Sequence, residues 1–247
     1  MRSFVRIAAL SIGVAAGMLS GVLASVAQAD SAGKAANPVV VVELFTSQGC
    51  SSCPPADAFL HELDKRAGVL PLSLHVDYWD YIGWKDVFGQ KQFTKRQHSY
   101  AVAAEQRSVY TPQIVVQGRE QVVGNHPKDV NALIARHQAA VQATVLQLSR
   151  EGAGLRIRAE TKQPGPMIVE LARYSPDEKV KIRRGENAGK TLSYTNVVRE
   201  WIVLGKWDGK APLDIDVPLK GTLSTAVIIQ RVVKRGLGPI EVAATLE

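Results

Sequence analysis

Two cysteines, Cys50 and Cys53, are the residues of this chain whose type and spacing most clearly point to chemistry. They are the only cysteines among 247 residues, and they form a C-x-x-C pair. The apolar, β-branched run Val39–Phe45 precedes them and predicts a buried strand, while the turn-forming segment Thr46–Gly49 leads to an expected helix start. A helix N-terminus stabilises a thiolate on the first sulfur, and the second sulfur lies one turn away. The pattern therefore indicates thiol–disulfide chemistry.

Three functions are compatible with the pair. In thiol–disulfide exchange, Cys50 is the expected nucleophile and Cys53 the thiol that resolves the mixed disulfide. As a metal site, Cys50, Cys53 and His75 would offer two thiolates and an imidazole, a ligand set that suits copper. The third function is a permanently closed, inert disulfide, although so short a loop constrains the unfolded chain only a little. No cofactor is expected.

The elements around the pair follow from periodicity. Helical spacing from Pro54 predicts a helix that ends near Gly68, and prolines are tolerated in its first turn, where their missing N–H groups cost little. Val69–Val76 alternates and predicts a strand, in which Pro71 implies an edge position or the beginning of the strand. The aromatic and acidic segment 77–86 is expected to be a loop, which either forms one wall of a binding cleft or packs against itself.

The next segments alternate helix and strand. Polar residues with a narrow apolar stripe predict a surface helix over 88–107. Pro112 directly precedes a β-branched strand, 114–116, and a turn joins that strand to a short partner around 122–123. Helical spacing then predicts a helix over 127–148.

Beyond residue 149, short alternating segments separated by Gly, Pro and charged turns predict an antiparallel β unit. The segment G-E-N-A-G-K, 185–190, lacks the spacing of a phosphate-binding loop and is expected to be a hairpin or a long β-turn. The predicted organisation is therefore a signal peptide at 1–29, a first domain at 30–148 and a β-rich domain at 149–247.

The N-terminus predicts export. Arg2 and Arg6 precede an uncharged apolar stretch, 7–26, and an A-x-A cleavage site, which is the layout of a secretory signal peptide. A retained membrane anchor is the alternative, but the small residues favour removal. We therefore expect a periplasmic or secreted protein without a stable membrane anchor after cleavage, in an oxidising compartment that permits disulfides. The expected partner is an extracytoplasmic protein or a small thiol.

The formal net charge of +7 does not indicate nucleic-acid binding. Such binding calls for a dense basic face with aromatic or helical readers, whereas the basic residues here are dispersed except at 179–184 and 231–235. We expect no nucleic-acid partner, and nothing in the sequence indicates an oligomeric state.

The order strand, C-x-x-C, helix, strand, helix, X-Pro, strand, hairpin strand, helix resembles the thioredoxin fold over residues 39–148. The resemblance implies an α+β protein with a thioredoxin-like N-terminal domain and a C-terminal antiparallel β-rich domain. It also implies that Thr111 and Pro112 form a cis peptide bond opposite the cysteines and line a substrate groove. Glu43 lies close to where such proteins bury an acid that modulates the redox pair, and Gly49 replaces the tryptophan that they commonly have before the first cysteine.

Four motifs resemble the secreted bacterial family known as domain of unknown function 1223: F-T-S-Q-G-C-S-S-C-P-P-A-D, H-V-D-Y-W-D-Y-I-G-W-K-D, Y-T-P-Q and G-E-N-A-G-K-T-L-S-Y-T-N-V-V-R. That family is thioredoxin-like in its N-terminal part, and it has no established biochemical activity. The sequence thus predicts an exported thioredoxin-like protein that is a candidate thiol–disulfide oxidoreductase. The alternative is a non-catalytic module that binds copper or a partner on the same fold.

Overall fold

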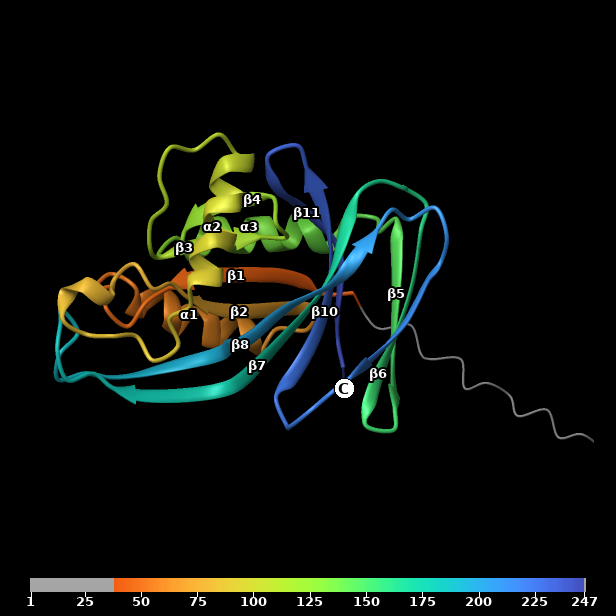
Figure 1. Ribbon diagram of the computed structural model, residues 1–247. Coiled ribbons are helices and arrows are strands. Elements are labelled where there is room, and N and C mark those ends of the chain that lie inside the picture. The colour runs from red at the N-terminus through yellow and green to blue at the C-terminus, as the bar shows by residue number, and fades with distance from the viewer. Residues whose placement is uncertain (1–37, 247) are drawn as a thin grey trace, which may run out of the picture. The chain divides into compact units, whose positions relative to one another are not determined.

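A computed structural model describes residues 38–246, which form an α+β fold (Figure 1). The predicted signal peptide, 1–29, lies outside the described residues. The helices are α1 (Pro54–Asp64), α2 (Lys91–Ala103) and α3 (Pro127–Gln138), with a 3-10 turn, η1 (Asp80–Ile82). The strands are β1 (Val40–Thr46), β2 (Val69–His75), β3 (Gln113–Val116), β4 (Glu120–Val123), β5 (Thr144–Glu151), β6 (Gly154–Thr161), β7 (Met167–Lys181), β8 (Thr191–Trp207), β9 (Leu213–Pro218), β10 (Ser224–Val233) and β11 (Gly236–Thr245). Within residues 38–246, no helix has the length and apolar composition needed to cross a membrane.

The strands of residues 38–246 form an eight-stranded mixed sheet and a three-stranded antiparallel sheet. The larger sheet has the order β11-β10-β7-β8-β2-β1-β3-β4, and the smaller one has the order β5-β6-β9. β1 is parallel to β2 and antiparallel to β3, which forms a hairpin with β4. The C-terminal strands form three antiparallel pairs, β7 with β8, β7 with β10, and β10 with β11. The predicted strands on both sides of the cysteine pair are therefore confirmed.

β1 is buried along its whole length because helices cover both faces of the sheet at this point. Val42 and Leu44 pack with apolar residues of α1 and α3. Val41 and Phe45, at the alternate positions, pack with apolar residues of α2. Because side chains alternate along a strand, Glu43 shares the face of Val41 and Phe45. The helix that follows the cysteines thus lies on the opposite face from Glu43.

β8 joins the C-terminal strands to the strands near the cysteines. It runs parallel to β2 and pairs with it at Ser73 and Val197. Pro71 is therefore the third residue of a central strand, and the prediction of an edge position or a strand start is wrong. The missing N–H of Pro71 is tolerated because the ladder between β2 and β8 does not include it, and the side chain of Asn196 donates to the Pro71 carbonyl over 3.0 Å.

The helix predicted over 127–148 is too long, because α3 ends at Gln138 and β5 begins at Thr144. Thr144 and Leu146 are buried, whereas Val145 between them is 53% exposed. This period of two is typical of a strand with one buried face. The predicted domain boundary after residue 148 falls inside β5, and the division into two domains stays a prediction.

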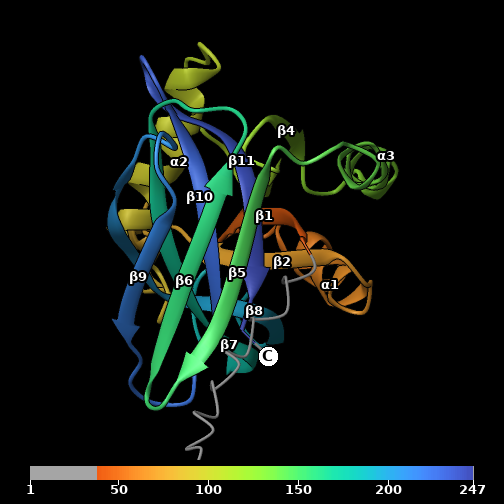
Figure 2. The same cartoon turned by 90° about the vertical axis from the view of Figure 1, so that its right-hand side faces the viewer.

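The three-stranded sheet packs on the C-terminal part of the larger sheet (Figure 2). Its inward side chains, among them Leu155 and Ile157, share an apolar core with Val169 of β7 and Val227 of β10. From this core the long strands β7 and β8 extend toward the loops that follow β1 and β2 (Figure 1). The C-terminal half thereby reaches the cysteine pair.

Candidate functional site

Cys50 and Cys53 form a disulfide bond between the end of β1 and the start of α1, with an S–S distance of 2.09 Å and a Cα–Cα distance of 5.4 Å. The Cys50 N–H donates to the Ser47 carbonyl, and the Cys53 N–H donates to the Cys50 carbonyl. α1 begins directly after Cys53, whose carbonyl accepts the N–H groups of Ala56 and Asp57. The predicted turn and helix start are confirmed, and both cysteines are fully buried.

Thr111 and Pro112 lie beside the first turn of α1. Their peptide bond is cis, as predicted. A Cβ atom on Gly124 would lie 3.0 Å from the Cβ atoms of both Pro112 and Ala56, so a glycine there allows the chain directly after β4 to fit between them. The Thr111 hydroxyl oxygen accepts a hydrogen bond of 2.8 Å from the indole N–H of Trp79. A role for the two residues in a substrate groove stays a prediction.

The aromatic loop, residues 77–86, packs against the cysteine turn. A Cβ atom on Gly49 would lie 3.0 Å from atoms of both Trp79 and Ile82, which leaves no room for a larger side chain before the first cysteine. Trp79 stacks on Tyr81 with ring centroids 6.3 Å apart, and Tyr81 is 80% exposed. The loop therefore both packs locally and presents aromatic surface beside the site.

A buried carboxylate, Asp57, lies one helical turn after Cys53. Its side-chain oxygens make no hydrogen bond within residues 38–246. Burial raises the pKa of Asp57 to about 7, against the lowering effect of the neighbouring His75. The sequence interpretation missed this residue. The signal was available, since Asp57 falls on the same helical face as Ala56 and Leu60, which are buried.

His75, at the end of β2, is bound to a carboxylate. Its Nδ1 lies 2.7 Å from Oδ2 of Asp86, and both side chains are fully buried. The Asp86 carboxylate also accepts the backbone N–H groups of Gln48 at 2.7 Å and Phe88 at 2.9 Å. Burial raises the pKa of Asp86, but His75 and these hydrogen bonds outweigh it and hold the pKa below its usual value. Asp86 therefore fixes the His75 ring, whose Nε2 makes no hydrogen bond within the described part of the chain.

Tyr194 of β8 covers the same polar groups from the C-terminal half. Its ring lies edge-to-face with that of His75, with centroids 4.7 Å apart. Burial raises the pKa of Tyr194, and the nearby charges of Asp57 and Asp86 raise it further, so the hydroxyl stays protonated. We call Asp57, His75, Asp86 and Tyr194 the acid–histidine cluster.

The hydrogen bonds of the Glu43 side chain are to residues of α2 and not to the cysteine pair. Glu43 is fully buried, its Oε1 accepts the Nε–H of Arg96 at 2.5 Å, and its other oxygen accepts the Tyr100 hydroxyl. Arg96 also pairs with Glu170 at 3.2 Å and lies over the ring of Trp201 at 3.9 Å. Burial lowers the pKa of Arg96, but the adjoining carboxylates reverse this, so the guanidinium stays charged. Glu43 belongs to a buried ion-pair network beneath α2.

The connection between β7 and β8 lies over the cysteine turn. We call residues 183–190 the cap. The side-chain amide of Asn187 donates to the carbonyls of Gln48 at 3.0 Å and Cys50 at 2.9 Å, and Asn187 is fully buried. The N–H of Ser51 donates to the Glu186 carboxylate over 3.3 Å. The turn predicted at 185–190 is confirmed, but no local pattern indicated that it contacts residues so far away in the chain.

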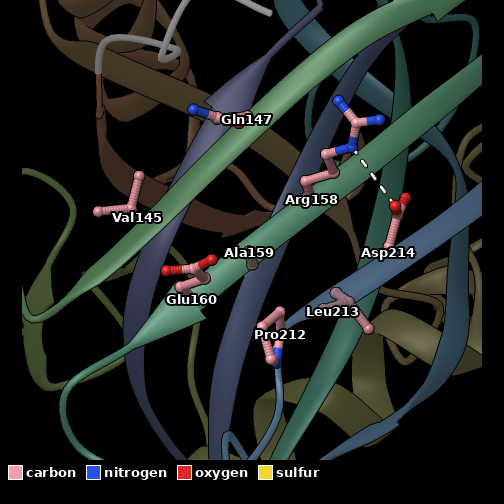
Figure 3. Close-up of a pocket in the computed structure, with 8 residues that line it drawn as sticks. All are labelled: Val145, Gln147, Arg158, Ala159, Glu160, Pro212, Leu213 and Asp214. Atoms are coloured by element: carbon pink, nitrogen blue, oxygen red, sulfur yellow. Dashed lines mark hydrogen bonds and ion pairs between the residues drawn. The ribbon is translucent and has the colours of Figure 1, made fainter. Parts of the chain in front are cut away.

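A metal site and a surface hollow are weaker candidates for a functional site. No group of three or more His, Cys, Asp or Glu side chains within residues 38–246 is arranged to hold a metal ion, and the two sulfurs predicted as ligands are bonded to each other. A hollow of about 380 Å³ lies on β5, β6 and β9 (Figure 3). Its Arg158 and Asp214 face each other, with Nε 3.4 Å from Oδ2, so these charges are already partnered.

Comparison with known proteins adds a family and a solved structure. A family model described as "Protein of unknown function (DUF1223)" matches residues 41–231. The X-ray crystal structure of a protein from Agrobacterium tumefaciens is similar, with 32% sequence identity and a TM-score of 0.73, over 86% of this chain and 95% of that one. No curated protein matches.

Proposed function

The chain belongs to the family described as a protein of unknown function (DUF1223), and we propose that it is an exported, thioredoxin-like protein that exchanges thiols and disulfides through Cys50 and Cys53. The observation that carries the proposal is the disulfide at the start of α1, beside the buried carboxylate of Asp57. A helix N-terminus favours the thiolate of the first cysteine. The strand order β2-β1-β3-β4, with α1 and α3 on one face and α2 on the other, supports the thioredoxin-like assignment.

In the proposed reaction, the Cys50 thiolate attacks one sulfur of a partner disulfide, and the other partner sulfur leaves as a thiolate. The Cys53 thiolate then attacks the Cys50 sulfur, which closes the Cys50–Cys53 bond and releases the second partner thiolate. Two electrons pass to the partner, and the reverse sequence oxidises a partner dithiol. Asp57 lies in the first turn of α1, four residues after Cys53, and burial raises its pKa to about 7, so in this proposal its carboxylate accepts the Cys53 proton at neutral pH.

Single cysteine variants test the exchange, with oxidised glutathione as the probe and mass spectrometry as the readout. We expect the reduced Cys50→Ser variant to lose turnover and the Cys53→Ser variant to accumulate a glutathione adduct on Cys50. Ser51→Ala, a change at an exposed neighbour, is the matched control and should react as the wild type does. Equal, undiminished exchange in both cysteine variants would refute the proposal. A reduction potential well below about −300 mV would instead indicate an inert structural bridge.

Copper binding and export are tested separately. Copper(I) titration of the reduced protein against the double Cys→Ser variant decides the metal alternative, because equal affinities would remove it. Export rests on the signal-peptide pattern, so the protein recovered from the extracytoplasmic fraction should begin at Asp30. An intact N-terminus on protein found inside the cell would contradict it.

A further inference from the structure

The cap is a preformed structure. Within it, the Ala188 N–H donates to the Gly185 carbonyl at 3.1 Å, and the Gly189 N–H donates to the carbonyl of Ile182, the residue directly before the cap, at 2.9 Å. The Lys190 ammonium donates to Oδ1 of Asn187 at 2.9 Å. Because the amide oxygen accepts this hydrogen bond, the amide group is oriented with its two N–H bonds toward the cysteine turn. The loop therefore holds Asn187 in one orientation.

The cap also rests on the aromatic loop. A Cβ atom on Gly185, whose φ is +76°, would lie 3.3 Å from the Cβ of Trp84 and 3.5 Å from Cδ1 of Ile82. The indole N–H of Trp84 in turn donates to Oε1 of Gln48 at 2.8 Å, and the Gln48 carbonyl accepts the amide of Asn187. The cap, the aromatic loop and the cysteine turn are thus joined through Gln48.

An attacking thiolate must reach a sulfur atom, yet both cysteines are 0% exposed. Ser51 and Ser52 are exposed between them, so the turn itself does not lie deep in the protein. We propose that Asn187 is a positioning residue of the exchange site and that the cap is its gate. This inference rests on the proposed function: a partner reaches Cys50 when the two hydrogen bonds of Asn187 open, and the same bonds restore the turn when the gate closes.

Reduction by dithiothreitol tests the gate without needing the natural partner. Dithiothreitol loses two electrons and two protons as it forms its own ring disulfide, and Cys50 and Cys53 become two thiols. Asn187→Leu keeps the approximate shape of the side chain and adds no charge, but it has no N–H donors, so it removes both hydrogen bonds to the turn. Because reduction occurs from the open state, we expect it to accelerate about 10- to 30-fold. The rate is followed by alkylation of the released thiols and mass spectrometry.

Asn125→Ala is the matched control. Asn125 also donates to a carbonyl of the same turn, that of Ser52 at 2.9 Å, but it is exposed and lies outside the cap. Its removal should leave the reduction rate close to the wild-type rate. If Asn187→Leu does not fold, as judged by urea unfolding, Lys190→Met replaces it. This variant frees the Asn187 amide to turn, so it should also accelerate reduction, whereas Lys181→Met should not.

A gate changes the rates of both reduction and reoxidation of the disulfide, and it does not change the equilibrium between the two redox states. We therefore expect reoxidation to accelerate by the same factor and the reduction potential of the pair to stay unchanged. Reduction at the wild-type rate in the folded Asn187 and Lys190 variants would overturn the gate, as would a change in potential that accounts for the whole acceleration. The proposed function fails independently if glutathione exchange is absent while Asn187→Leu still speeds reduction.

Discussion

Asp57→Asn should remove a large pH dependence from the stability of the folded protein. The pKa of the buried Asp57 carboxyl rises from 3.8 to about 7 on folding. Between these values the unfolded chain releases the proton while the folded protein keeps it, so stability falls as the pH rises through this window and levels off above pH 7. This rise in pKa corresponds to a decrease of about 4 kcal/mol in the free energy of unfolding. An uncharged asparagine at this position does not cause that decrease.

Urea titrations of the oxidised protein between pH 4 and pH 8, followed by tryptophan fluorescence, measure this difference. We expect the free energy of unfolding of Asp57→Asn, minus that of wild type, to increase by about 4 kcal/mol from pH 4 to pH 8, which means that the variant becomes relatively more stable. Asp129→Asn, a change to an exposed acid in the first turn of α3, is the matched control. Parallel curves for wild type and Asp57→Asn would show that the Asp57 carboxyl is not desolvated, and would refute the reasoning about proton transfer as well.

Arg96→Met should lower the free energy of unfolding by about 3–5 kcal/mol in urea, because two buried carboxylates lose their cation, and unchanged stability would contradict the network. Glu43→Gln should lower stability but leave glutathione exchange at the wild-type rate; a loss of exchange as large as in the cysteine variants would instead support the predicted redox-modulating role of Glu43. Gly118→Ala should cost about 1–3 kcal/mol more than Gly152→Ala in thermal unfolding. Both glycines have positive φ, but a Cβ at 118 would lie 2.8 Å from a backbone carbonyl of β11, whereas one at 152 meets nothing within 4 Å. Equal losses would contradict that contact.

Local patterns predicted the strands and helices around the cysteines because these elements are defined by residues close together in the sequence. The apolar run before the pair and the prolines after it determine a strand end and a helix start. Pro112 at the start of β3 was identified for the same reason. Where two periods compete, the same reasoning failed, as in residues 139–148, where a strand alternation follows directly on a helical one.

The composition of the site could not be predicted in full because it depends on which face a side chain occupies and on distant contacts. Glu43 and Asp57 are both buried acids near the cysteines in sequence, and only the tertiary structure assigns Glu43 to Arg96 of α2 and Asp57 to the neighbourhood of His75 and Asp86. Asn187 has no sequence signal, since a polar residue in a hairpin turn is ordinarily exposed to solvent. Its role follows from β8 pairing with β2, a contact between strands far apart in the chain.

The separation between the cap and the cysteines has a consequence for biosynthesis. Asn187 follows Cys50 by 137 residues, so the ribosome completes the cysteine turn well before it makes the residue that covers it. If the cap gates the pair as proposed, an oxidant that meets the chain before the cap is made encounters uncovered sulfurs, whereas any later partner encounters the closed site. The first oxidation of the pair would then face a different barrier from any later exchange, and refolding the full-length reduced protein in one step would not reproduce the first.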